Sequence, residues 1–371
     1  MALGNVSVNN LNLGQGAVTE IERYFLFIGP AGKNVGKLLP LNTQSDLDGE
    51  LGIPGSDLKT QIAAARLNGG DRWACLAAPI ATAGSWQDAL EHAMRENASV
   101  EAAVITHPVS SGAELSAMND AAMAIASRYG RRLFVMAASA GIAAQQDWAS
   151  YLAEQRAITD GIAAGRVLVV PQLHGNNLGV LAGRLANAAV SIAASPMRVA
   201  TGPLLGLGAT PLDSAGVPLP SATLAELDRA RFSVPQTYPD YPGTFWGDGN
   251  LLDAPGSDFQ VIEYLRIVDK AARRVRVLLI QRVADRRLNN TPNSMAANTS
   301  ALMAPLRAMS RSVAFAGQVF PGEIEPPKDG DIVLIWQSKT RVEAYIKARP
   351  YNCPKDLTAN IALDLSTNDL E

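Results

Sequence analysis

The chain has 371 residues, of which 47% are hydrophobic and 18% charged, and its net charge is −3. This length suggests two domains, the apolar content excludes wholesale disorder, and the charge balance excludes a general polyanion binder. The sequence has no apolar stretch of about 18 residues that would predict a membrane span, and its two distant cysteines predict neither a disulfide framework nor a metal cluster.

The first 20 residues are predicted to form an extended arm. Asparagines separate the apolar residues, and neither a cap nor a 3.6-residue period indicates a helix. The apolar residues of the arm are Val6, Val8, Leu11 and Leu13. A segment this short has no core of its own, so it is either loose or pairs with another part of an assembly.

Residues 21–250 show the alternation of an α/β domain. Short apolar runs predict strands at 22–29, 72–78, 102–106, 132–137 and 166–170. Periodic segments predict helices at 56–68, 85–96, 114–129, 146–163 and 177–194. Ser56 is a predicted N-cap, and Gly69 and Gly130 are predicted helix stops. Strands that recur after one helix each favour right-handed crossovers and a mostly parallel sheet.

A proline- and glycine-rich connector follows at residues 196–256, with 9 Pro and 8 Gly, which predicts loops and short strands. Residues 251–358 then form a predicted α+β domain. Helices are predicted at 258–275 and 299–310, where Pro305 would kink or delay the second, and 277–283 is either a strand or a continuation of the first helix. Strands are predicted at 332–337 and 341–348, and a last strand or arm lies within residues 359–371, at 359–365.

Candidate enzyme motifs are incomplete. The loop Gly29–Lys37 follows a strand as a phosphate loop would, but Ala31 stands where the first glycine is required. Ser139 follows a strand among small residues, as in a nucleophile elbow, and Asp160 and His174 come after it in hydrolase order. The first glycine of that motif is absent, and His174 with its following asparagines more simply caps a helix. The sequence predicts no catalytic, cofactor-binding or metal-binding residue.

The segment 257–311 is basic, with 10 Arg and Lys against 4 Asp and Glu, whereas the rest of the chain is acidic. Arg266, Lys270 and Arg273 recur at helical spacing and form one stripe, which Arg274 and later arginines extend. The stripe is either a solvated helix face or a surface for an acidic protein partner. No aromatic residues are interleaved for stacking on nucleic acid.

The order of several short motifs resembles that of contractile tail sheath proteins, found in bacteriophage tails and pyocin-like injection particles. A strand ends in Phe27-Ile28-Gly29-Pro30-Ala31, and a loop with Leu39-Pro40-Leu41 follows. Further along come a turn at Asn68-Gly69-Gly70-Asp71, a helix with Ala182-Gly183-Arg184, and a small-Ser-Pro segment at residues 194–196.

The resemblance implies a non-enzymatic subunit without a cofactor. Its α/β domain would be the outer sheath domain, and its α+β domain the core domain with extended N- and C-terminal arms. The arms would add strands to neighbouring subunits through the apolar residues Val6, Val8, Leu11, Leu13, Ile361, Leu363 and Leu365. The inner tail tube would contact the basic residues Arg266, Lys270, Arg273 and Arg274.

The implied partners are further copies of the chain, in hexameric rings stacked as a helical sheath, together with the inner tail tube, baseplate and tail terminator proteins. Direct contact with nucleic acid or membrane is not implied. The sheath would belong to the virion, assemble in the cytoplasm of the bacterial host, and contract to drive the tube through the envelope. Two alternatives stay open: a soluble α/β hydrolase-like enzyme using Ser139, and another virion assembly protein.

Overall fold

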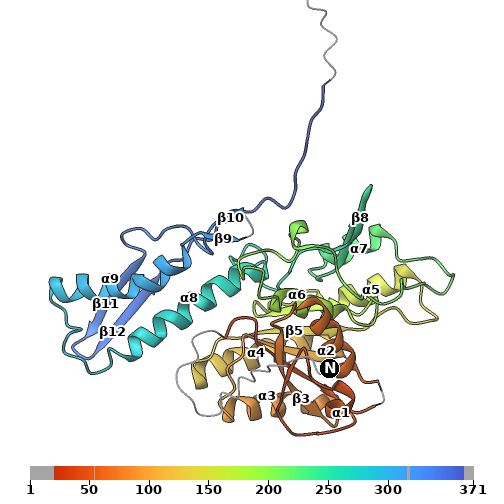
Figure 1. Ribbon diagram of the computed structural model, residues 1–371, viewed down its shortest axis with the longest axis horizontal. Coiled ribbons are helices and arrows are strands. Elements are labelled where there is room, and N and C mark those ends of the chain that lie inside the picture. The colour runs from red at the N-terminus through yellow and green to blue at the C-terminus, as the bar shows by residue number, and fades with distance from the viewer. Residues whose placement is uncertain (1–20, 54, 316–317, 363–371) are drawn as a thin grey trace, which may run out of the picture.

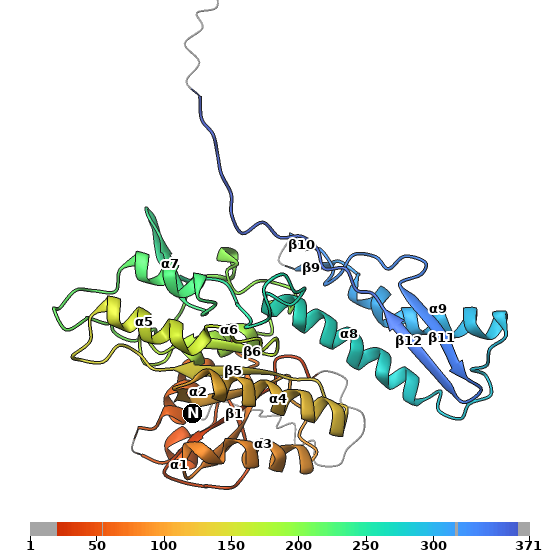
Figure 2. The same ribbon diagram turned by 180° about the vertical axis from the view of Figure 1, so that it is seen from behind.

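A computed structural model describes residues 21–53, 55–315 and 318–362. Figures 1 and 2 show an α/β unit built from the first two thirds of the chain, and beside it a smaller unit of helices and a β-ribbon. The long helix α8 (Ile262–Ile280) runs from the first unit into the second. Mixed α/β structure with a mostly parallel sheet is confirmed.

The sheet of the α/β unit has six strands in the order β2-β3-β1-β4-β5-β6. All neighbours are parallel except the edge strand β2, which is antiparallel to β3. Apart from that edge the order is that of a doubly wound sheet, as right-handed crossovers produce. The strands are β1 (Phe25–Pro30), β2 (Leu39–Asn42), β3 (Ala74–Ile80), β4 (Ala102–Val109), β5 (Phe134–Ser139) and β6 (Val167–Pro171).

Helices cover both faces of the sheet, so its central strands are apolar throughout. On β1, Leu26 and Ile28 face one core while Phe25 and Phe27 face the other. The first core is covered by α3 (Trp86–Arg95), α4 (Gly112–Tyr129) and α5 (Trp148–Thr159). The second is covered by α1 (Leu47–Leu51), α2 (Asp57–Asn68) and α6 (Asn177–Ala186).

Helices α2 and α6 pack with their backbones almost in contact. A Cβ added to Gly179 would lie 2.1 Å from the carbonyl oxygen of Gln61, and one added to Gly183 would lie 2.3 Å from that of Ala65. Only glycine fits at these two positions, because both obstacles are backbone atoms of α2. The predicted cap of α2 is also present, since Ser56 accepts a hydrogen bond from the backbone N–H of Lys59.

Two predicted elements of the α/β unit end elsewhere. Helix α6 stops at Ala186 rather than at residue 194, because the Asn187 side chain accepts from the backbone N–H of Ala189 and starts a turn. The connector 196–256 holds more regular structure than predicted. It contains the short 3₁₀ turn η2 (Val199–Thr201), helix α7 (Ser221–Arg229) and the hairpin of β7 (Pro235–Tyr238) and β8 (Tyr241–Trp246).

The second unit is built on α8, α9 (Pro292–Met309) and the antiparallel pair β11 (Ile332–Ser338) and β12 (Arg341–Ile346). A short hairpin of β9 (Val313–Phe315) and β10 (Gln318–Phe320) precedes the pair. Of the two readings of 277–283, helix is right up to Ile280, and Pro305 lies inside α9 without ending it. In the described part of the tail, residues 359–362 form no strand.

Helix α8 joins the two cores. Ile262 and Leu265 belong to the second core of the sheet, whereas Ile267, Ala271 and Val275 pack against α9 and β11. One continuous helix therefore carries apolar contacts of both units. Among the described residues, no helix has the length and apolar character needed to cross a membrane.

Candidate assembly surfaces and the joint at helix α8

Charged residues precede four of the parallel strands. Glu22 comes before β1, Glu101 before β4, Arg132 before β5 and Arg166 before β6. Parallel strands begin at the same edge of a sheet, so these side chains gather at its amino edge. Helix α8 crosses that edge and pairs with all four, which makes the edge a charged joint between the two units.

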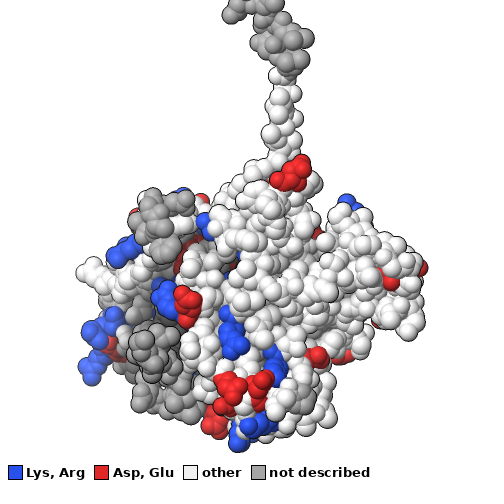
Figure 3. Space-filling view, turned by 45° about the vertical axis from the view of Figure 1, so that its right-hand side comes forward, with Lys and Arg blue, Asp and Glu red and all other residues white. Residues whose placement is uncertain are grey.

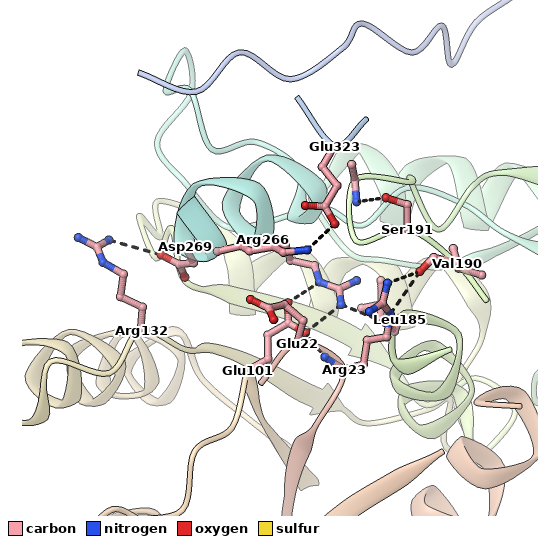
Figure 4. A network of polar contacts seen from close by, with 12 residues as sticks. Glu22, Arg23, Glu101, Arg132, Leu185, Val190, Ser191, Arg266, Asp269 and Glu323 are labelled. Carbon is pink, nitrogen blue, oxygen red and sulfur yellow. Dashed lines mark hydrogen bonds and ion pairs between the residues drawn. The ribbon is translucent and has the colours of Figure 1, made fainter. Parts of the chain in front are cut away.

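Arg266 and Glu101 form the centre of the joint (Figure 4). Nε and one terminal nitrogen of Arg266 donate to the two carboxylate oxygens of Glu101 at 2.7 and 2.9 Å. The same terminal nitrogen donates to the carbonyl oxygen of Leu185 at 3.0 Å. The two side chains are 2% and 1% exposed, so this is a fully buried bidentate ion pair.

Asp269, one turn further along α8, carries the opposite charge. Both of its carboxylate oxygens accept from Arg166, at 2.8 and 2.9 Å, and Arg132 approaches one of them at 3.4 Å. A second nearly buried bidentate pair thus lies beside the first. Because Asp269 carries the charge opposite to that of Arg266, a helix displaced by one turn would place Asp269 beside the like charge of Glu101.

The last two pairs involve basic residues of the predicted stripe. Arg273 donates to Glu22 at 2.8 Å, and Lys270 to Glu323 at 2.5 Å. Burial raises the pKa of Glu22, but the charge and hydrogen bond of Arg273 outweigh it and hold that pKa below its ordinary value. The Glu22 carboxylate is therefore kept ionised against the guanidinium.

The positions of Arg266, Lys270 and Arg273 in the joint correct the predicted tail-tube contact. Arg266 and Lys270 are 2% and 6% exposed and paired within the chain, so the prediction is wrong for both. Arg273 is paired with Glu22 and largely covered. Only Arg274 of the four is half-exposed without a place in the joint.

Sequence reasoning missed the carboxylates of the joint, because they lie far away in the chain. Glu101 is 165 residues from Arg266, and Glu22 is 251 residues from Arg273. One usable signal is the recurrence of a charged residue just before a buried parallel strand. A helix whose charges recur at i, i+3, i+4 and i+7 can then pair with that edge instead of with solvent.

The predicted arm residues are only partly described. Val6, Val8, Leu11, Leu13, Leu363 and Leu365 lie outside the described residues. Ile361 is 96% exposed, on a tail that leaves the body as a narrow stalk (Figure 3). Residues 357–362 of the stalk are uncharged and exposed, so this part of the tail is not packed against the body.

The β11–β12 ribbon has one buried and one open face. Ile332 and Leu334 pack on the α8–α9 core, whereas Val333, Ile335 and Tyr345 are 42%, 42% and 52% exposed. Within the described residues the two strands pair only with each other, so each has an open edge. An open edge beside exposed apolar side chains is a template for strand addition.

The residues of the hydrolase alternative do not form a site. Ser139 is completely buried at the end of β5, and its hydroxyl finds no hydrogen-bond partner among the residues that the structure describes. Asp160 is exposed after α5, and His174 is engaged with Asn177, whose side chain accepts from the His174 backbone at 2.6 Å. A buried hydroxyl without a base cannot reach a substrate.

Models of the DUF2586 family match the chain in two parts. The N-terminal domain model matches residues 3–250, and the C-terminal domain model matches residues 258–366. A protein of Haemophilus phage HP1 (strain HP1c1) that is named as a tail sheath protein is 44% identical over 372 residues, covering 98% of both chains. This chain belongs to the family of contractile tail sheath proteins.

Solved structures share the sheath fold at low sequence identity. A chain from the cryo-EM structure of the contracted helical sheath of the anti-feeding prophage is 13% identical, with a TM-score of 0.60, and covers 97% of this chain and 98% of its own. A chain from the baseplate of the same particle is 12% identical, with a TM-score of 0.58, and covers 98% and 100%. The sheath relative of phage HP1 indicates that the chain is a structural subunit of a contractile tail sheath, and the hydrolase alternative is not supported.

Proposed function

We propose that this sheath subunit polymerises by strand addition, with the terminal arms of one copy pairing with the β11–β12 ribbon of another. The observation that carries the proposal is the ribbon itself, which within the described part of the chain has two open edges and an exposed apolar face. Main-chain hydrogen bonds between the arm and the ribbon stabilise such a contact. The apolar side chains of the arm fix the register in which its strand pairs.

The arms allow neighbours to stay linked while they move. The tail segment is exposed and lies away from its own body (Figure 1), so it can reach a second copy. An arm that reaches from one subunit to a different surface of the next makes a head-to-tail contact, and such contacts build rings when they close and helical tubes when they do not. A sheath of stacked hexameric rings would use closed contacts within each ring and open, helical contacts between rings.

Contraction in this proposal needs no nucleotide. The extended lattice would be metastable, and its conversion to a better-packed lattice would move the inner tube through the bacterial envelope. The subunit would contact the baseplate at one end of the sheath and the terminator at the other. It would assemble in the host cytoplasm and become part of the virion.

The contact with the inner tube falls to basic residues outside the joint. Arg274 is half-exposed, and Arg286, after the end of α8, is exposed. An electrostatic contact suits this role, since contraction must release it. Reversing both charges, Arg274→Glu with Arg286→Glu, is expected to reduce co-sedimentation with the tube protein at least about tenfold at low salt. The variant Arg95→Glu, at an exposed position on α3, serves as the control. Equal binding by the wild type, the control and the double variant contradicts the assignment.

Negative-stain microscopy of the purified protein tests polymerisation. Tubes or stacked rings are expected at high protein concentration, because each subunit both offers and accepts an arm. A monodisperse particle of one subunit at the same concentration contradicts the proposal.

A further inference from the structure

The C-terminal tail is tied to the body at two successive points. The first is Arg349, just after β12, whose two terminal nitrogens each donate at 2.6 Å to the carboxylate of Asp331. Asp331 is 2% exposed, and the carbonyl oxygen of Arg349 accepts from the backbone of Glu325. This bidentate pair holds the tail to the second unit.

The second point is Lys355, which returns the tail to the α/β side of the molecule. Its ammonium group lies 2.7 Å from both carboxylate oxygens of Asp248, in the loop after β8, and 2.7 Å from Glu263 in the first turn of α8. Glu263 is 3% exposed, and in the described ranges its second carboxylate oxygen has no hydrogen-bond partner. Beyond Lys355 the described tail is exposed to residue 362.

The residues around the Lys355 ammonium group are mostly acidic. Asp228 lies near Asp248, and the positive charge of Arg231 acts on both carboxylates while its guanidinium donates to the carbonyl oxygens of Leu251 and Gln260. Burial raises the pKa of Glu263, and Lys355 opposes that rise. The Lys355 ammonium group is therefore well matched to its surroundings, and its removal leaves the buried Glu263 carboxylate without the cation that is paired with it.

We propose that Lys355 is the positioning residue of the C-terminal arm: seated on Asp248 and Glu263, it fixes the point and direction from which the arm leaves the body toward a second copy of the chain. The inference rests on the proposed strand addition. With Lys355 seated, the free arm starts at residue 356. With Lys355 released, the free arm starts after Arg349 and gains six residues, an extra reach of about 20 Å. The contact of Lys355 with Asp248 and Glu263, which we call the latch, thus limits which neighbouring subunit the arm can reach.

Limited proteolysis of the unassembled full chain tests the role of Lys355, and its result does not depend on polymerisation. Tyr351 lies between the two anchors, and Leu357 lies outside them and is 82% exposed. In Lys355→Gln, chymotryptic cleavage after Tyr351 is expected to accelerate roughly tenfold through local opening, while cleavage after Leu357 stays unchanged. Lys339→Gln, at an exposed turn, is the matched control and should leave both rates unchanged.

A second variant separates the latch from general stability. The triple change Lys355→Gln, Asp248→Asn and Glu263→Gln removes all three charges, so no buried carboxylate is left unpaired, and it should free Tyr351 as the single change does. Unchanged cleavage after Tyr351, or an equal rise at all sites of the chain, overturns the latch. If the wild-type protein shows the slow cleavage after Tyr351 that the latch predicts but forms no tubes, the latch stands and the proposed strand addition is contradicted.

Discussion

Replacement of Glu101 by glutamine is expected to lower the free energy of unfolding by about 3–5 kcal/mol. Glutamine keeps the shape of the side chain but removes the charge opposite Arg266. The guanidinium then stays buried at 2% exposure with neither solvent nor counter-ion. Glu101 also accepts from the backbone N–H of Arg23 at 2.6 Å, so the change weakens the entry to β1 as well. Equilibrium denaturation in urea measures the effect.

The exposed pair of Arg128 and Glu91 supplies the control for this prediction. Its side chains are 64% and 33% exposed, so Glu91→Gln should cost less than about 1 kcal/mol. The double change Glu101→Leu with Arg266→Met removes both charges and should recover much of the lost stability. Equal small costs for Glu101→Gln and Glu91→Gln would show that the joint contributes little to stability.

The sheet was predictable because local patterns and topology agree in it. The runs around Phe27, Val104 and Val135 are apolar on both faces, and a helical segment separates each predicted strand from the next. The edge strand β2 was missed because Leu39-Pro40-Leu41-Asn42 is short and contains a proline. Edge strands tolerate proline, because the backbone N–H groups on the outer side of such a strand form no hydrogen bonds to another strand.

Of the joint at α8, the sequence could predict the basic side chains of the helix but not the acidic residues that pair with them. Helical spacing correctly placed Arg266, Lys270 and Arg273 on one stripe, but spacing cannot show what faces a stripe. A solvated surface, a tube contact and an internal ion-pair joint share the same local pattern. The decision lies in long-range contacts to Glu101 and Glu22, which loop closure and packing of the whole chain determine.

Deletion of residues 2–16 is expected to abolish polymerisation while leaving a folded subunit. The segment holds the apolar residues of the N-terminal arm, Val6, Val8, Leu11 and Leu13, whereas among the described residues the cores of both units are built from Tyr24 onward. Strand addition depends on every link of the lattice, so removal of one arm per subunit removes a whole class of contacts at once. Negative-stain microscopy and sedimentation report on the polymer, and circular dichroism reports on the fold.

A matched variant distinguishes the side chains of the arm from its length. Serine at positions 6, 8, 11 and 13 keeps the backbone able to hydrogen-bond but removes the apolar groups that would lie on the ribbon face around Val333 and Ile335. If the arm works by strand addition with apolar register, this variant should polymerise weakly and only at higher concentration, between the wild type and the deletion. Polymers of normal length from the deleted protein contradict the role of the N-terminal arm, and they would leave the C-terminal arm, which leaves the body after Lys355, as the link between subunits.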